Sequence, residues 1–225
     1  MTLKKQETRQ SPDSSAPNWF YEAQLSVRSG ANRVAGVDEA GRGPLAGPVV
    51  AAAVILDINN IPDGLNDSKK LSANKREALF EIMMAKTHSG EVDVGIGIAE
   101  PEEIDRINIL HATMAAMQRA VADLAVLPDA VLIDGNHCPK FTVPAQAIVK
   151  GDAKSLSIAA ASIIAKTFRD RLMKDADHRF RGFGGYDHTS HKGYPTKAHR
   201  EALKEIGASP IHRRSYGPVR DVLPR

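Results

Sequence analysis

The fold of this chain is decided by the stretch Val34-Ala35-Gly36-Val37-Asp38-Glu39-Ala40-Gly41-Arg42-Gly43-Pro44. Its apolar beginning predicts a buried strand that ends at two adjacent carboxylates, and a glycine–arginine–glycine turn follows at once. Carboxylates at a strand end are hard oxygen ligands that suit Mg²⁺ or Mn²⁺. A flexible turn with backbone amides and one guanidinium suits a phosphate. Metal and phosphate ligands side by side indicate phosphoryl-transfer chemistry.

The rest of the chain predicts an α/β domain around this strand. Apolar runs predict strands, and helical spacing with N-cap signals predicts helices. We expect strands over residues 34–38, 48–56, 91–98, 130–133 and 145–149, and helices over 19–29, 72–88, 107–124, 155–177 and 196–206, with a short helical turn at Pro101. Strands that come first and then alternate with helices favour a mixed sheet flanked by helices, with a helical C-terminal segment.

Composition is ordinary for a globular protein of 225 residues, with 42% hydrophobic and 25% charged residues. Cys138 is the only cysteine, which excludes an internal disulfide and favours a reducing compartment. No window approaches the ~20 apolar residues of a membrane span, and no apolar run follows Lys4 and Lys5 as it would in a secretory signal. We therefore expect a cytoplasmic protein that does not contact a membrane.

Charge is distributed unevenly along the chain. Residues 1–149 contain 14 Lys and Arg against 19 Asp and Glu, whereas residues 150–225 contain 16 against 8. A basic C-terminal third beside an acidic body is typical of a surface that binds a polyanion next to a cation site. The same pattern also fits a solvated basic helix face, so the charges alone do not decide between the two.

Acidic residues end three of the predicted strands: Asp38 and Glu39, Asp134, and Asp152. Sites in α/β sheets collect at strand ends, so neighbouring strands would bring the four carboxylates together. Such a group must take up protons or bind cations. Two divalent ions roughly 4 Å apart can activate a water and stabilise the leaving oxygen of a phosphodiester.

Each acid also has a structural interpretation. An aspartate after a strand is often a turn former or a helix N-cap, and this explains Asp134 or Asp152 taken singly. A turn or capping role explains the adjacent pair Asp38 and Glu39 less well. The glycines of the turn form GxGxxxG, which is neither the dinucleotide GxGxxG nor a P-loop. The metal hypothesis therefore depends on all four acids converging.

Further motifs, taken together with the first, resemble ribonuclease HII, the type 2 ribonuclease H family. The motifs cover roughly residues 33–220 in order, and they are Asp38–Pro44, Leu65–Ser72, Ile133–Asn136, Lys150–Asp152, Ile158–Lys166, His191–Thr196 and His212–Ser215. The resemblance implies a ribonuclease H-like fold. It also implies an endoribonuclease that hydrolyses RNA in RNA–DNA hybrids and cuts on the 5′ side of single ribonucleotides embedded in duplex DNA.

The resemblance also implies roles for particular residues. The acidic quartet of the family matches Asp38, Glu39, Asp134 and Asp152, with Mn²⁺ or Mg²⁺ as cofactor. The glycine–arginine–glycine segment matches Gly41, Arg42 and Gly43, whose backbone would contact the 2′-hydroxyl of a ribonucleotide. Tyr194 matches the tyrosine that stacks on the sugar of the following deoxynucleotide. For phosphate contact we expect Lys69. Lys166 and Arg169 could either reach the nucleic-acid backbone or pair with Asp170. We expect surface or capping roles for His191 and His199, and a basic tail at His212-Arg213-Arg214.

The sequence leaves two other functions open. A non-catalytic nucleic-acid binding module would use the basic third alone, and a metal-dependent phosphatase would use the same acids on small phosphoesters. We expect residues 1–32 to be a partly disordered tail and residues 33–225 to form the catalytic domain. We also expect a monomer whose partners are RNA–DNA hybrid and ribonucleotide-containing duplex DNA.

Overall fold

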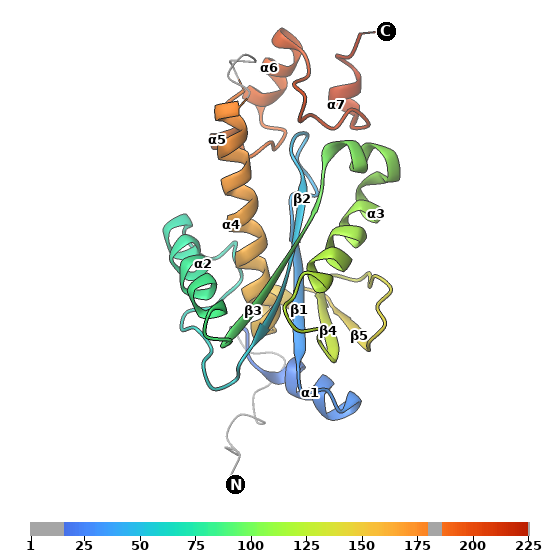
Figure 1. Ribbon diagram of the computed structural model, residues 1–225. Helices are drawn as coiled ribbons and strands as arrows, with labels where there is room; N and C mark the ends of the chain where they lie inside the picture. The colour runs from blue at the N-terminus through green and yellow to red at the C-terminus, as the bar shows by residue number, and fades with distance from the viewer. Residues whose placement is uncertain (1–15, 180–185, 225) are drawn as a thin grey trace.

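The computed structural model describes residues 16–179 and 186–224. Within these residues the chain forms one sheet of five strands in the order β3-β2-β1-β4-β5, with helices on both faces (Figure 1). The strands are β1 (Val34–Ala40), β2 (Val49–Leu56), β3 (Val92–Ala99), β4 (Ala130–Asp134) and β5 (Ala145–Ile148). Since β2 pairs antiparallel with both β1 and β3 while β4 pairs parallel with both β1 and β5, the sheet is mixed, as predicted.

The helices cover the sheet in two layers. Helices α2 and α4 lie on one face and α3 lies on the other, while α6 and α7 lie beyond the end of the sheet where β1 turns into β2 (Figure 1). The helices are α1 (Phe20–Ser29), α2 (Ala73–Thr87), α3 (Pro101–Ala122), α4 (Leu156–Arg179), α5 (His188–His191), α6 (Lys197–Ile206) and α7 (Gly217–Arg220), with a short 3₁₀ helix η2 (Gly151–Ala153). No helix in these described ranges has the length and apolar character to cross a bilayer.

The central strand β1 fixes where the site forms. It is parallel to β4, with Val37 opposite Ile133. The carboxyl ends of the two strands therefore reach the same edge, which brings Asp38 next to Asp134. The pairing of β1 with β2 continues to Ala40, two residues past the predicted end at Asp38, so Glu39 as well as Asp38 lies inside the strand.

Close contact between α4 and β1 depends on a glycine. A Cβ placed on Gly36 would lie 2.1 Å from the backbone carbon of Ser157, so no larger residue fits without moving the helix. The first turns of α4 continue this contact with small, fully buried side chains at Ala159, Ala160 and Ala161. The beginning of α4, and Asp152 just before it, are thereby held against the centre of the sheet.

Most predicted elements are confirmed to within two residues. Ser72 caps α2 through a hydrogen bond from the N–H of Lys75, and Gly30 ends α1 at a φ of 71°. Helix α3 is kinked at Asn108, where φ is 65°, which agrees with a short helical turn followed by a longer helix. The sequence did not predict α5, α7 or η2, and residues 1–15 of the expected tail lie outside the described residues.

Candidate active site

Three of the four predicted acids converge closely. Asp38, Asp134 and Asp152 each offer a carboxylate oxygen, and these oxygens lie within 4.8 Å of one another. Asp38 and Asp152 are buried, whereas Asp134 is half-buried. Glu39 lies outside this trio but lines the same cavity as Asp38 and Asp134.

Local backbone geometry fixes the positions of Asp134 and of the loop that carries Asp152. Asp134 Oδ1 accepts a hydrogen bond of 2.6 Å from the backbone N–H of Gly151, which joins the end of β4 to the loop that carries Asp152. That loop turns sharply because Lys150 adopts a left-handed conformation with φ 57°. A side chain on Gly151 would meet Ile158 Cδ1 at 2.7 Å. Asp134 is thus tied to its neighbour in the site and does not cap a helix.

The trio carries more negative charge than the protein neutralises. Burial, followed by the charges of Glu39 and Asp134, raises the pKa of Asp38 well above its ordinary value. Burial and the charge of Asp152 raise the pKa of Asp134. Burial also raises the pKa of Glu39, and the opposing charge of Arg42, at 3.4 Å, only partly offsets it.

Lys69 is the cation that contacts the trio directly. Its Nζ donates to Asp152 Oδ2 at 2.9 Å, although its side chain is 77% exposed. Burial opposes the charge of Lys69, but the hydrogen bond and charge of Asp152 outweigh burial and raise its pKa. Because the side chain is so exposed, this ion pair adds little stability and can open when a better ligand arrives.

The donor set fits a divalent metal ion. Three carboxylates from separate segments supply hard oxygen ligands, which Mg²⁺ and Mn²⁺ prefer. The raised pKa values of Asp38 and Asp134 mean that ionising both is costly without a cation. A divalent ion held by Asp38, Asp134 and Asp152 would remove this cost.

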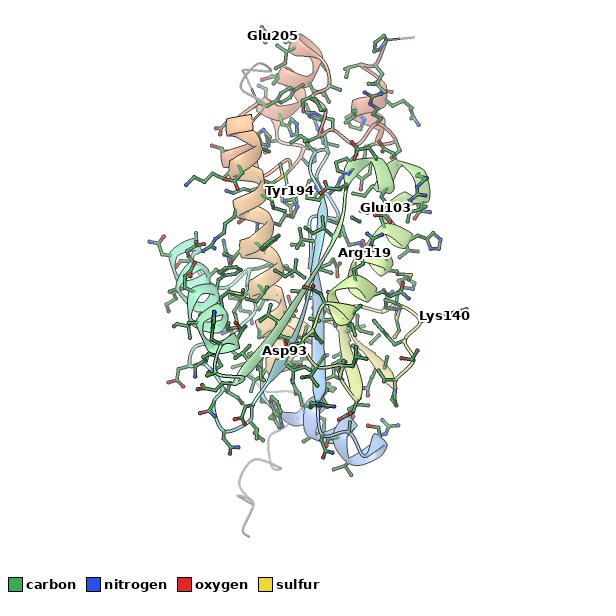
Figure 2. The ribbon with its side chains drawn as sticks, in the orientation of Figure 1. Asp93, Glu103, Arg119, Lys140, Tyr194 and Glu205 are labelled. Atoms are coloured by element: carbon green, nitrogen blue, oxygen red, sulfur yellow. The ribbon has the colours of Figure 1, made fainter. Side chains whose placement is uncertain are left out.

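A cavity of about 260 Å³ opens over Asp38, Glu39 and Asp134, and Asp152 lies outside its lining. Its lining includes all the residues predicted to contact substrate: Gly41, Arg42, Gly43, Lys69, Lys166 and Tyr194. Figure 2 shows Tyr194 between α4 and the central strands. Its ring borders the turn, since a Cβ on Gly43 would lie 3.7 Å from Tyr194 Cε1. A larger hollow of about 610 Å³ lies between α1 and the opposite ends of β1 and β2, away from the carboxylates.

Two fully buried arginines support the turn between β1 and β2. Arg213 donates to the carbonyl oxygens of Gly41, Arg42, Pro44 and Gly47. In each peptide unit the N–H points opposite to the C=O. The amides of residues 42 and 43 therefore point away from Arg213, and neither has a backbone partner among the described residues.

Arg169 completes this support from α4. It donates to the carbonyls of Ala46, Pro48 and Lys192. Burial, followed by the charge of Arg213, lowers the pKa of Arg169 to about 10, so Arg169 remains charged at neutral pH. The sequence did not predict these roles: it gave Arg169 either contact with the nucleic-acid backbone or a pair with Asp170, and it placed Arg213 in a basic tail. The structure instead buries both guanidinium groups against backbone carbonyls.

Of the other residues with a predicted role, Lys166 agrees with its prediction and His199 does not. Lys166 pairs with Asp170 at 2.6 Å on α4 while still lining the cavity, which is one of its two expected arrangements. The sequence also predicted surface or capping roles for His191 and His199, but His199 is buried. Its partner is His212 of the supposed basic tail, at 2.9 Å between Nε2 atoms.

Comparison with known proteins identifies the family of this chain. The family model of ribonuclease HII matches residues 35–219. This chain belongs to the ribonuclease HII family. It is therefore an endoribonuclease, a hydrolase that acts on nucleic acid and depends on a divalent metal. Family membership decides against the non-catalytic binding module that the sequence had left open.

Curated relatives match over most of their length. Ribonuclease HII of Maricaulis maris is 62% identical over 192 residues, which span 85% of this chain and 84% of the relative. Ribonuclease HII of Paracoccus denitrificans is 54% identical over 209 residues, spanning 92% and 96%. The family therefore extends over nearly the whole chain.

Solved structures agree with the ribonuclease H-like fold. Ribonuclease H2 from Pyrococcus horikoshii OT3 superposes with a TM-score of 0.67 at 31% identity, covering 84% of this chain and 96% of that one. The ribonuclease HII from Archaeoglobus fulgidus, solved in complex with PCNA, gives 0.65 at 26%, covering 85% and 97%. Bst-RNase HIII in complex with Mn²⁺ gives 0.62 at 18% identity, covering 89% and 72%, and shows the shared fold alone.

Proposed function

We propose that this enzyme hydrolyses the RNA strand of RNA–DNA hybrids and cuts on the 5′ side of single ribonucleotides embedded in duplex DNA. Asp38, Glu39, Asp134 and Asp152 are its catalytic residues. The observation that carries the proposal is one cavity lined both by Asp38, Glu39 and Asp134 and by the supported turn of residues 41–43. The acids and the turn would thus contact the same segment of substrate.

The carboxylates would hold Mn²⁺ or Mg²⁺ through Asp38, Asp134 and Asp152, with Glu39 completing the site. When bound, such an ion polarises the scissile phosphate and lowers the pKa of water. The protein's own contribution is to fix the oxygens before substrate arrives. Asp134 is locked by the Gly151 amide, and Asp38 accepts the N–H of Glu39 at 2.7 Å.

The turn supplies selectivity for RNA. The amides of Arg42 and Gly43 point away from Arg213, which leaves them able to bind an acceptor oxygen in the cavity. The 2′-hydroxyl is the group that distinguishes RNA from DNA, and it can accept these hydrogen bonds. The exposed guanidinium of Arg42 and the ammonium groups of Lys69 and Lys166 would contact phosphates nearby.

Tyr194 is the reader of the junction between RNA and DNA. Its side chain is 43% exposed and borders the turn, so its ring can stack on the sugar that follows a bound ribonucleotide. Stacking of this kind contributes roughly 1–3 kcal/mol to nucleic-acid binding. Loss of the ring should therefore weaken cutting at a lone ribonucleotide more than cutting of a long hybrid.

We further propose a monomer of which residues 33–225 are the catalytic domain, acting in the cytoplasm on cellular nucleic acid. The basic C-terminal third supports a polymer substrate over a small phosphoester. The relative from Archaeoglobus fulgidus was solved with PCNA, which makes a sliding clamp the first protein partner to test.

The decisive test is Asp38→Asn. This change keeps the shape of the side chain but removes one ligand charge, so cleavage of a duplex with one ribonucleotide should fall at least about a thousandfold. Hybrid binding, measured by fluorescence anisotropy, should stay within about threefold because Asp38 is buried and adds repulsion, not attraction. Asp63→Asn, in an exposed loop, is the matched control and should cut normally. Full activity of Asp38→Asn would reject the assignment.

A further inference from the structure

Two buried histidines lie behind Tyr194. His199 of α6 and His212 of the loop before α7 are each 1% exposed, and their Nε2 atoms are 2.9 Å apart. His199 Nδ1 lies 2.9 Å from the carbonyl oxygen of Tyr194. At the far end, His212 Nδ1 accepts the backbone N–H of Ser209 at 3.0 Å. Polar contacts thus connect Ser209 to Tyr194 through two rings.

These partners determine where each ring carries its proton. A carbonyl oxygen only accepts, so Nδ1 of His199 is the protonated nitrogen facing Tyr194. A backbone N–H only donates, so Nδ1 of His212 is bare and its proton is on Nε2. His212 therefore donates to His199, which in turn donates to Tyr194. The hydroxyl of Ser209, 2.7 Å from Nδ1 of His212, can donate to the same bare nitrogen.

The backbone around Tyr194 is held on its other side as well. Its N–H donates to the carbonyl of His191 at 2.8 Å, and the ring of His191 stacks on His199 with centroids 4.1 Å apart. The preceding Gly193, at φ 80°, accepts the N–H of Leu45 from the turn at 2.8 Å. The Tyr194 carbonyl is thus the link between the histidine pair and the residue that borders the cavity.

We propose that His199 and His212 are positioning residues for Tyr194: their hydrogen-bond relay sets the tyrosine ring against the sugar that follows a ribonucleotide, and so sets the preference for an RNA–DNA junction. The relay acts through Tyr194 and touches neither the carboxylates nor the turn amides. This inference rests on the proposed function, because it concerns how one part of that substrate is read. It assigns a role to two residues that the sequence placed in a surface position and in a basic tail.

A matched pair of substitutions at one position tests the relay. In His199→Asn the amide nitrogen can replace Nδ1 as the donor to Tyr194, whereas in His199→Gln it falls near Nε2 and cannot. His199→Gln should lower kcat on a duplex with one ribonucleotide about tenfold, since displacement of a reading group by ~1 Å costs up to about a hundredfold. Its kcat on a long RNA–DNA hybrid should fall less than about threefold. His199→Asn should recover most of the loss.

A double-mutant cycle separates positioning from general damage. Tyr194→Ala should itself lose the junction preference, and adding His199→Gln to it should not lower the ratio of the two activities further. His212→Asn removes the donor to His199 and should lower the same ratio, which provides a second variant should His199→Gln not fold. Losses that are equal on both substrates, or that add in the cycle, would overturn the inference.

The same experiment distinguishes the inference from the proposed function. A wild-type enzyme that cuts neither substrate, with Mn²⁺ or with Mg²⁺, rejects the proposed function and the inference with it. A wild-type enzyme with a junction preference that depends on Tyr194, but not on His199 or His212, rejects the inference alone.

Discussion

Glu22 is a buried acid outside the catalytic cavity. Its side chain on α1 is 1% exposed, and its Oε1 accepts hydrogen bonds from the hydroxyl of Ser155 and from the N–H and hydroxyl of Ser157. Its Oε2 has no hydrogen-bond partner among the described residues. Burial raises the pKa of Glu22, and these hydrogen bonds offset only part of the effect. The residue thus joins α1 to the beginning of α4, although burial makes its negative charge unfavourable.

We expect the stability of this tie to depend on pH. Because the folded-state pKa of Glu22 is above its ordinary value of 4.5, the folded protein binds more protons than the unfolded chain between these two pKa values. The free energy of unfolding should therefore fall as pH rises through this window. Glu22→Gln cannot ionise and should become more stable relative to wild type as pH rises above 4.5. Urea unfolding of both proteins at pH 5 and pH 8 measures this, and a pH-independent difference would contradict it.

The sequence predicts the roles of some single residues better than those of others. Asp38, Asp134 and Asp152 were identifiable because each follows an apolar run that predicts a strand, and strand ends meet. Arg213 and His199 carry no such signal. Arginine is mostly exposed in proteins and histidine is intermediate. The burial of Arg213 depends on contacts with a segment more than a hundred residues away, and that of His199 on a partner ring.

At the scale of elements, the turn from β1 to β2 is stabilised by Arg213 of the C-terminal segment. Arg213 brings five guanidinium donors into a fixed planar fork, which suits four convergent carbonyls. Few of these bonds could form to a lysine, which has a single nitrogen. The geometry of the substrate-facing amides is therefore a property of the C-terminal segment as well as of the turn.

Arg213→Lys tests this support. The substitution keeps the charge but leaves buried carbonyls without partners, so the free energy of unfolding should fall by roughly 3 kcal/mol. Cleavage should also fall by at least about tenfold at temperatures where the variant remains folded, because the amides of residues 42 and 43 are no longer aimed. Arg214→Lys, whose side chain is exposed, is the matched control. Unchanged cleavage by a folded Arg213→Lys would show that the turn holds its own shape.

The elements themselves were largely predictable, for a physical reason. The amphipathic helix α6 and the apolar strands repeat their pattern over enough residues to be recognised, and the N-cap Ser72 marks the start of α2. Helices α5 and α7 have four residues each, which is too short for any period to show. Strand β1 exceeded its predicted end because pairing with β2, and not local composition, decides where it stops.

At the scale of the whole molecule, charge is arranged in two opposed groups. Asp38, Asp134 and Asp152 converge, and the basic C-terminal third contributes Lys166 to the lining of the cavity. Two of the cations counted in that third, Arg169 and Arg213, are buried and do not contribute to a binding surface. The sequence therefore overstated the positive charge available for nucleic acid.

Removal of metal should reveal the repulsion among the acids. The proposed metal site exists only in the folded protein, so divalent ions at a hundred times the dissociation constant should add about 2.7 kcal/mol to stability. This corresponds to a rise in Tm of roughly 5–10 °C for a chain of this size. Thermal unfolding in EDTA and in MnCl₂ or MgCl₂ at matched ionic strength measures the effect. Asp38→Asn should be more stable than wild type in EDTA and should gain less from metal.

The hydrogen bonds from Arg213 to the first hairpin have a consequence for synthesis. All four proposed catalytic acids precede residue 213 in the chain, so the ribosome synthesises them before Arg213. The hydrogen bonds that orient the amides of residues 42 and 43 can form only after Arg213 has been made. The turn is therefore the last part of the proposed site to reach its final geometry during synthesis.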